Sequence, residues 1–159
     1  AEADALLAAE PHDPYFLELK GQILLESGRP ADAVAPLREA VRRTNQPLIS
    51  VLLAHALIAT EDPANFAEAE QVLRVAVQRD RENPFAWYQL GVVYERRGDT
   101  PRAALATAER YAMMGDHNLA LRSADVAVQG LKPGTVDYLR AQDIAMTSRA
   151  AVEQQRKKR

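Results

Sequence analysis

The stretch that decides the fold is NPFAWYQLGVVYERRG, residues 83–98. Four of its residues recur at i, i+3, i+4 and i+7 and therefore share one face of a helix: Trp87, Leu90, Gly91 and Tyr94. Asn83 is a good cap in front of Pro84, whose missing N–H costs nothing in the first turn. Gly98 suits the left-handed conformation that ends a helix. The stretch therefore predicts a short helix with one packed face and a tight stop.

The same pattern recurs, which makes this helix part of a repeat. Counted from Pro84, the stretch matches the W-x2-L-G-x2-Y signature of the tetratricopeptide repeat (TPR). Similar copies begin at Pro14 and Pro47, so that successive copies start 33 and 37 residues apart, and the turn EDPANF in the copy from Pro47 is three residues longer. Small residues at repeat positions 8, 20 and 27 let antiparallel helices approach closely. They are Gly21, Ala33 and Ala40, then Ala54, Ala69 and Ala76, then Gly91 and Ala103.

The register shifts after Gly98. The next predicted helix, residues 101–114, has Thr107 and Arg110 at positions where the repeat requires apolar or small residues. Counted afresh from Pro101, positions 8, 11, 15, 20, 24 and 27 become Ala108, Tyr111, Gly115, Ala120, Ala124 and Ala127. One helix is therefore expected to end one repeat and begin the next.

These patterns predict an all-α fold, a TPR right-handed superhelical solenoid of antiparallel helix pairs. We expect a single TPR domain over residues 1–159, which the chain enters in mid-array. Its parts are the end of a preceding repeat helix and turn (1–13), repeats at 14–46 and 47–83, a half repeat at 84–100, an offset repeat at 101–134, and a solvated capping helix with a basic tail at 135–159.

Composition limits the classes of function. The chain of 159 residues is 47% hydrophobic but only 6% aromatic, has no Cys, and carries a formal net charge of −2. It begins AEADALL, without Met, as a processed form or a fragment does. No segment approaches the roughly 18 apolar residues of a membrane span, and no segment resembles a signal peptide. We therefore expect no transmembrane segment and, with interspersed charge, no nucleic-acid partner.

The basic tail QQRKKR, residues 154–159, is the one local run of charge. Its simplest role is a favourable interaction with the C-terminal end of the last helix dipole, together with solubility. The alternative is electrostatic docking to an anionic membrane or to nucleic acid.

No catalytic constellation is present in the sequence. Zinc-peptidase chemistry needs two imidazoles one helical turn apart with a Glu between them, whereas His12, His55 and His117 each stand alone. His12 and His117 fall in turn sequences and are expected to be solvated. Glu68 and Glu70 flank one residue of a helix, so they project to different sides and are expected on a solvated face. We therefore expect this chain to be no enzyme and to hold no metal and no cofactor.

The expected function is protein binding. Positions 2, 5, 9 and 12 of the first helix in each repeat face the concave groove of such arrays. The candidate groove residues are Tyr15, Glu18, Gln22, Leu48, His55, Phe85, Tyr88, Glu95 and Arg102, with Val51, Leu105 and Glu109 at equivalent positions. Aromatic and Leu side chains among scattered polar groups suit an extended or unfolded peptide. Alternatively, Leu48, Val51 and Phe85 pack between neighbouring helices. The Lys/Asn/Arg cluster that clamps a peptide carboxylate in some arrays is missing, because Glu18 and Gln22 occupy its first positions.

Several longer phrases carry a more specific resemblance. They include PYFLELKGQILLE, NPFAWYQLGVVYERRGD, AALATAERYAMMGDHNLALRSADVA and YLRAQDIA. Over residues 3–145 the chain resembles the C-terminal repeat region of bacterial zinc-dependent peptidases with chaperone function, the BepA-like group. The chain departs from the pattern at Lys20, where an apolar residue is expected, and in its basic tail after Thr147.

The resemblance implies a peptidase domain, absent from this chain, that carries H-E-x-x-H and zinc and acts in the periplasm on outer-membrane protein assembly and quality control. The repeats would then hold protein or unfolded-peptide clients. The alternative is a free-standing TPR adaptor or scaffold in another envelope assembly or secretion system. Leu6 and Leu7 cannot both point inward, and Phe16, Leu17 and Ile23 need more cover than one short helix gives. We therefore expect the absent catalytic domain to pack on this N-terminal end, and the isolated chain to form a weak homodimer through it.

Overall fold

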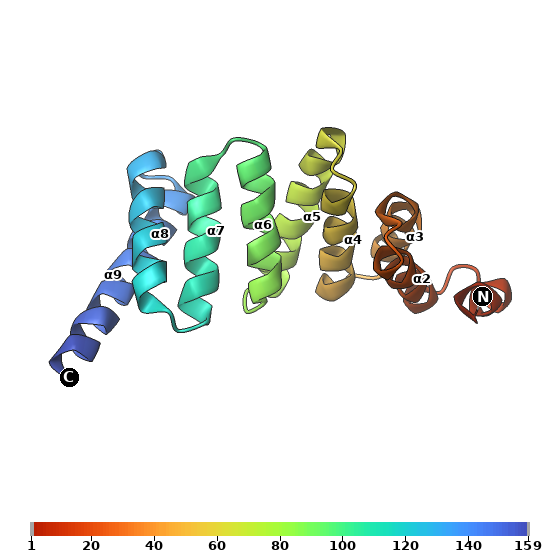
Figure 1. The fold of residues 1–159 in the computed structure, drawn as a ribbon, viewed down its shortest axis with the longest axis horizontal. Helices are drawn as coiled ribbons and strands as arrows, with labels where there is room; N and C mark the ends of the chain where they lie inside the picture. Colours follow the sequence, from red (N-terminus) through yellow and green to blue (C-terminus); the bar gives the residue numbers. More distant parts are fainter. Residues whose placement is uncertain (1, 159) are drawn as a thin grey trace. The chain divides into compact units, whose positions relative to one another are not determined.

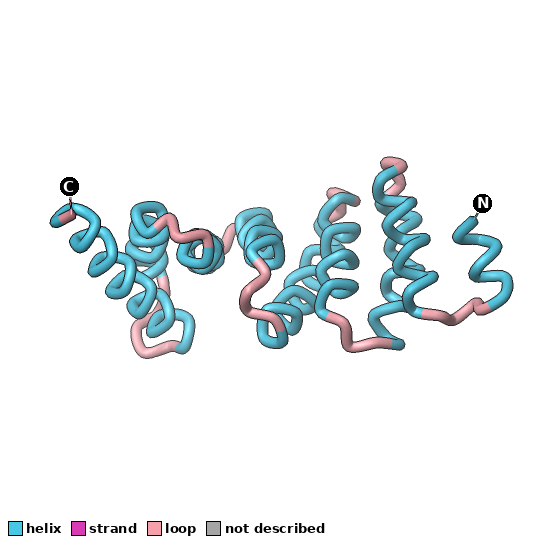
Figure 2. The backbone as a smooth tube through the Cα atoms, turned by 90° about the horizontal axis from the view of Figure 1, so that it is seen from below, coloured by secondary structure: helices cyan, strands magenta, loops and turns pink. Residues whose placement is uncertain are grey.

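Helices form all the regular structure in the part of the chain that the structure describes. The computed structural model describes residues 2–158; Ala1, expected in the first helix, and Arg159, expected in the basic tail, lie outside the described residues. The helices are α1 Glu2–Ala9, α2 Pro14–Glu26, α3 Pro30–Arg43, α4 Pro47–Ala59, the 3-10 helix η1 Pro63–Asn65, α5 Phe66–Arg79, α6 Pro84–Arg96, α7 Thr100–Met113, α8 His117–Gly130 and α9 Val136–Lys157. Figure 2 shows only helices and loops, and the all-α prediction is confirmed.

The helices fall into two compact units. Unit 1 is Ala1–Arg81 and holds α1 to α5; unit 2 is Glu82–Arg159 and holds α6 to α9. Within each unit, helices that follow one another along the chain pack against each other (Figure 1). Among residues 2–158, no helix combines the length and the apolar character that crossing a membrane requires.

Local sequence explains where the helices begin and end. The Asn83 side chain accepts hydrogen bonds from the backbone N–H groups of Phe85 and Ala86, both at 3.1 Å, as the predicted cap requires. At the other end of α6, Gly98 has a φ of 75°, and the Asp99 N–H donates to the Tyr94 carbonyl at 2.8 Å. These bonds satisfy backbone groups that a helix end leaves without partners. The predicted cap and stop are confirmed.

The core of unit 1 is built from large aliphatic residues. Its fully buried side chains include Leu37, Ile49, Leu53, Leu57 and Leu73. Gly21 lies where α2 approaches α3, and a Cβ atom added there would overlap the side chain of Leu37. A glycine is therefore needed for the close approach of these two helices.

The longer turn predicted in unit 1 is the site of η1. The Asp62 side chain accepts a hydrogen bond from the Ala64 N–H at 2.9 Å. The Asn65 amide donates to the Thr60 hydroxyl oxygen at 2.8 Å. The three additional residues thus form an ordered turn before α5 begins at Phe66, whose side chain is buried.

The core of unit 2 is built mainly from alanine. Seven of its fully or nearly fully buried residues are Ala103, Ala106, Ala108, Ala120, Ala124, Ala127 and Ala141. Helix α7 packs against α6 through one side and against α8 through another. Ala108 belongs to the cluster that α7 forms with α8 and α9, and Tyr111 packs against this cluster. The assignment of α7 to two repeats stays a prediction.

The start of the last helix differs from the expected solvated cap. In α9, Val136, Leu139 and Met146 are 83%, 56% and 65% exposed. The expectation of a polar outer surface is therefore wrong for the first part of α9. It missed these residues because the polar character of the helix increases only towards its C-terminal end.

The two carboxylates expected on a solvated face are instead engaged. Glu68 accepts two hydrogen bonds from the Arg38 guanidinium, at 2.8 and 2.7 Å, and joins α5 to α3. The Glu70 side chain is only 16% exposed and lies 3.8 Å from Arg74. The sequence could not show the first pair, because its partners lie 30 residues apart.

Candidate functional site

The candidate groove residues of unit 1 lie on two neighbouring first helices. Tyr15 on α2 and Leu48 on α4 are 56% and 64% exposed, and α2 contacts α4. His55 on α4 is also exposed. The exposed Tyr15 and Leu48 are therefore available to a partner, whereas Val51, also assigned to the groove, is buried in the core.

Two polar groove candidates of unit 1 differ in their surroundings. The Gln22 amide donates to the Glu26 carboxylate at 2.9 Å on the exposed surface of α2. Glu18 is half-buried, and this burial raises the pKa of its carboxyl above the ordinary value. Lys20, which departs from the repeat pattern, is half-buried and forms an ion pair with Asp4 at 2.9 Å. Its charge therefore has a local structural role between α1 and α2.

In unit 2, two candidate residues line a pocket between α6 and α7. Its lining consists of Pro84, Phe85, Tyr88, Arg110 and Met114, and its volume is about 430 Å³. We call it the aromatic pocket. The rings of Phe85 and Tyr88 stack with centroids 6.3 Å apart. The Arg110 guanidinium lies 5.1 Å from the centroid of the Tyr88 ring and 5.6 Å from that of Tyr111, within cation–π range.

The remaining candidates of unit 2 are divided between exposed and engaged side chains. Glu95 is exposed on α6. Arg102 binds Asp99 and Asp137, each at 2.9 Å, and thereby links α7 to α9. The hydrogen bonds that the Arg102 guanidinium donates to Asp137 and Asp99 raise the pKa of this guanidinium further above its usual range. Arg102 is therefore committed to internal ion pairs, even though it is an exposed residue.

Glu109 and Leu105 do not face a groove. The Glu109 side chain is only 3% exposed and accepts hydrogen bonds from Arg140 Nε at 2.6 Å and Nη2 at 2.7 Å. Leu105 is buried in the cluster formed by α7, α8 and α9. The groove assignment of both residues is wrong, because α9 covers the side of α7 on which they lie.

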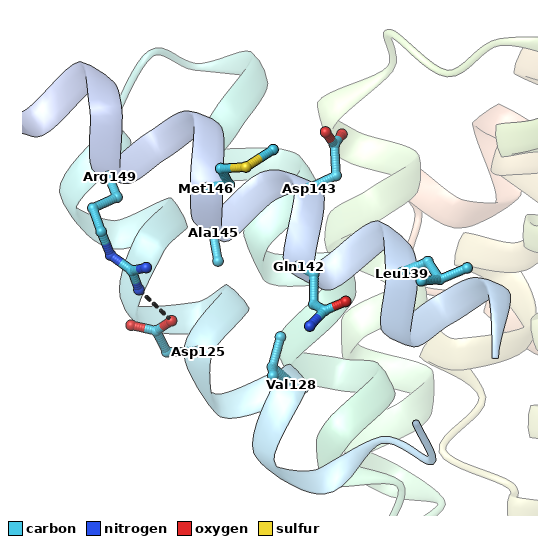
Figure 3. A pocket seen from close by; sticks show the side chains of 8 residues that line it. All are labelled: Asp125, Val128, Leu139, Gln142, Asp143, Ala145, Met146 and Arg149. Atoms are coloured by element: carbon cyan, nitrogen blue, oxygen red, sulfur yellow. Dashed lines mark hydrogen bonds and ion pairs between the residues drawn. The ribbon is translucent and has the colours of Figure 1, made fainter. Parts of the chain in front are cut away.

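A second pocket, of about 550 Å³, lies between α8 and α9. Figure 3 shows Leu139, Gln142 and Met146 projecting from α9 on its rim, with Val128 opposite on α8. Arg149 reaches Asp125 across the end of this pocket at 3.2 Å (Figure 3). Its lining combines the apolar side chains of Val128, Leu139, Ala145 and Met146 with polar and charged ones.

The residues that could bind a metal are scattered. Among residues 2–158, no three His, Cys, Asp or Glu side chains are grouped so that they could hold a metal ion. His12 is exposed and lies 4.0 Å from Glu39. His117, expected in a solvated turn, is instead the first residue of α8 and half-buried.

Sequence reasoning missed Arg110 and Met114 as lining residues of the aromatic pocket. The available signal was Arg110 itself, a charged residue at a repeat position that requires a small one. A cation at a repeat position that normally packs between two helices needs a favourable contact outside that interface. In the structure, that contact is with the pair of tyrosine rings on either helix of the aromatic pocket.

Paired helices with exposed aromatic side chains define a class of protein, the helical repeat scaffold that binds other proteins. The sequence profile described as "Tetratricopeptide repeat" matches residues 1–46 and 52–127. The chain belongs to the tetratricopeptide repeat family. It is thus a protein-interaction domain.

Curated relatives and solved structures extend this result. The "Beta-barrel assembly-enhancing protease" of Escherichia coli (strain K12) is 25% identical over 135 residues, which are 85% of this chain and 27% of that protein. The protein of the same name from Yersinia pestis is 27% identical over 136 residues, with the same coverage of both chains. The chain therefore spans about a quarter of the length of these relatives.

Two solved structures share the fold. The crystal structure of MamA has a TM-score of 0.67 and 19% identity, and the match covers 98% of this chain and 87% of that chain. A thermophilic TPR protein of Thermus thermophilus, TTC0263, has a TM-score of 0.53 and 22% identity, with coverage of 91% and 87%. At these identities the likeness shows the fold alone.

Proposed function

We propose that this chain is the C-terminal, client-binding or partner-binding part of a periplasmic zinc metallopeptidase that acts in outer-membrane protein assembly or quality control. The observation that carries the proposal is the 25% identity to the Escherichia coli Beta-barrel assembly-enhancing protease over 85% of this chain. That region is about a quarter of the relative's length. The catalytic zinc would belong to a separate peptidase domain, and this chain would supply binding surface.

The exposed aromatic residues are the parts of the chain that suit this role. Tyr15 in unit 1 and Phe85 and Tyr88 in unit 2 are about half exposed, although buried aromatic residues are far more common in repeat seams. Aromatic side chains are frequent anchors in protein interfaces, because they bury a large area with few rotatable bonds. An unfolded or extended client offers the apolar side chains that such anchors bind.

The proposal is tested by the gene and by crosslinking. The reading frame that encodes this chain should also encode H-E-x-x-H upstream. A photo-crosslinking residue at Tyr15 or Tyr88 of the full-length protein should capture outer-membrane proteins or their assembly factors in cells. Probes at Val75 and Val126, which are exposed on the second helices α5 and α8, serve as matched controls. Crosslinks only at the control positions would reject the groove, and a reading frame without the motif would favour the free-standing adaptor.

A further inference from the structure

The aromatic pocket of unit 2 combines an apolar wall with one cation. Pro84, Phe85 and Met114 supply the apolar lining, and Phe85 and Met114 are 47% and 57% exposed. Arg110 is half-buried, and its guanidinium lies 5.1 Å from the ring centroid of Tyr88 and 5.6 Å from that of Tyr111. Both parts lie within the same pair of helices, α6 and α7, so the site is complete in unit 2.

The cation of this pocket is available to a ligand. Among residues 2–158, no carboxylate forms an ion pair with Arg110, whereas Arg38, Arg102 and Arg140 each bind one or two. The two ring contacts hold the guanidinium in place but leave its N–H groups without an anionic acceptor. A planar guanidinium binds carboxylates through these groups, so the charge is complementary to an acid.

The volume and lining of the aromatic pocket limit the size of the apolar ligand group that it can accept. A pocket of about 430 Å³ lined by two stacked rings, a thioether and a proline fits one large aromatic or aliphatic side chain. The acid must then lie within a residue of that side chain in order to reach Arg110. These two requirements define a short recognition element, one apolar residue next to one carboxylate.

The backbone around the pocket indicates that the acid is a side chain. Capture of a chain-terminal carboxylate commonly uses unpaired backbone N–H groups. Here the N–H groups of Phe85 and Ala86, at the start of α6, are already bonded to the Asn83 side chain. The other side-chain donors among the lining residues are the Tyr88 hydroxyl and the Arg110 guanidinium, and only the guanidinium carries a charge. An internal Asp or Glu therefore fits this pocket better than a free C-terminus.

We infer that the aromatic pocket binds an extended peptide segment in which a large apolar residue stands next to an Asp or Glu. The inference rests on the proposed protein-binding function and assigns a sequence preference to one of its surfaces. The apolar side chain enters between Phe85 and Met114, and the carboxylate accepts hydrogen bonds from Arg110. This preference concerns only the aromatic pocket of unit 2, so contacts that a client makes with unit 1 do not depend on it.

The test uses the whole chain and short peptides with acetylated and amidated ends, except for one peptide whose C-terminus is free. Four octapeptides in a Gly/Ser background are compared by NMR titration: one with Phe-Glu, one with Phe-Gln, one with Ala-Glu, and one that ends in Phe with a free α-carboxylate. Phe-Glu should bind about tenfold more tightly than Phe-Gln and Ala-Glu, as charge-assisted hydrogen bonds and aromatic burial allow. The difference between Glu and Gln should shrink at high salt.

Variants separate the two parts of the site. Arg110→Gln should abolish the preference for Glu over Gln and keep the preference for Phe over Ala, whereas Phe85→Ala should do the reverse. Arg110→Lys retains the charge and should retain part of the Glu preference. Met146→Ala, in the α8–α9 pocket, is the matched control and should change neither preference.

The outcomes that overturn the peptide preference of the aromatic pocket differ from those that would overturn the proposed function of the chain. Equal binding of the Phe-Glu and Phe-Gln peptides by the unmodified chain, or no binding of either at millimolar concentration, overturns the inference without any variant. Tighter binding of the peptide with the free α-carboxylate also overturns it and assigns the pocket to chain ends. Crosslinking of clients at Tyr15 would leave the proposed function standing in each of these cases.

Discussion

The two units contain the same kind of cross-link in different surroundings. In unit 1, Arg38 binds Glu68 through two hydrogen bonds, and the two side chains are 41% and 34% exposed. In unit 2, Arg140 binds Glu109 through two hydrogen bonds of similar length, but the Glu109 side chain is only 3% exposed. The geometry is nearly equal, and the burial of the carboxylate is not. Burial, rather than bond length, should therefore decide how much each pair contributes to stability.

The cores of the two units differ in a related way. Large aliphatic side chains share the core of unit 1 with alanines, while alanine is the commonest residue among the buried hydrophobics of unit 2. Gly21 and Gly91 occupy the same repeat position, yet a Cβ atom added at Gly21 would overlap Leu37, and one added at Gly91 would lie 3.7 Å or more from its nearest neighbours. A glycine at this repeat position is therefore required for helix packing in unit 1 but not in unit 2.

The largest expected effect comes from the buried pair. Arg140→Met keeps the apolar stem but removes both donors from a buried carboxylate, which should lower the free energy of unfolding by about 3 kcal/mol. Arg38→Met exposes Glu68 to water and should cost about 0.5 kcal/mol. Urea denaturation, combined with amide hydrogen exchange in α7 to α9 and in α2 to α5, measures each effect in its own unit.

The control for this comparison is removal of the buried carboxylate itself. Glu109→Gln leaves Arg140, whose side chain is 37% exposed, with access to solvent and to Asp143. It should therefore cost less than Arg140→Met. Equal losses for Arg38→Met and Arg140→Met would show that burial does not distinguish the two pairs.

The second expected effect concerns the glycines. Gly21→Ala forces Leu37 to move within a packed core and should destabilise unit 1 by about 2 kcal/mol. Gly91→Ala meets only ordinary van der Waals contacts and replaces a poor helix former, so it should stabilise unit 2 by about 0.5 kcal/mol. Thermal melts followed by circular dichroism would give the two shifts opposite signs.

A companion variant isolates the cause at Gly21. Leu37→Val removes volume beside the new methyl group, so the double variant Gly21→Ala/Leu37→Val should lose less stability than the sum of the single changes. Additive losses would mean that the strain lies in the backbone rather than against Leu37.

Local sequence predicted much of the fold because its causes are local. The cap at Asn83 and the stop at Gly98 follow from residue types and spacings within one or two turns. The Arg38–Glu68 and Glu109–Arg140 pairs were not predictable in this way, since their partners lie 30 and 31 residues apart. Their formation depends on how successive helices rotate against each other.

The candidate site was predictable only in part for the same reason. Periodicity found the exposed positions of Tyr15, Leu48, Phe85 and Tyr88. It placed Glu109 beside them because period alone cannot show that α9 covers that side of α7. Burial of a charged residue requires knowledge of its distant partner.

The smallest expected effect is a dependence of unit 1 on pH. Hydrogen bonds from Arg38 lower the pKa of Glu68 below its ordinary value, whereas burial raises the pKa of Glu18. The stabilisation by ionised Glu68 is therefore present above the ordinary Glu pKa and lost as pH falls through the lowered value. The folded state instead favours protonated Glu18, so that contribution is present below the ordinary pKa and lost as pH rises through the raised value.

Single substitutions separate these opposite contributions. At pH 7, Glu68→Gln should lower the free energy of unfolding by about 0.5 kcal/mol, because it weakens a partly exposed ion pair with Arg38. Glu18→Gln should raise the free energy of unfolding by about 0.5 kcal/mol, because it removes a partly buried charge. The Glu18 difference should shrink as pH falls through the raised pKa of Glu18, whereas the Glu68 difference should shrink only at lower pH, as pH falls from the ordinary Glu pKa through the lowered pKa of Glu68. Urea denaturation at several pH values from pH 7 downwards measures the change. A Glu18→Gln variant that is less stable than the parent chain at pH 7 would contradict the sign, since it would mean that the ionised carboxylate of Glu18 stabilises unit 1 despite its burial.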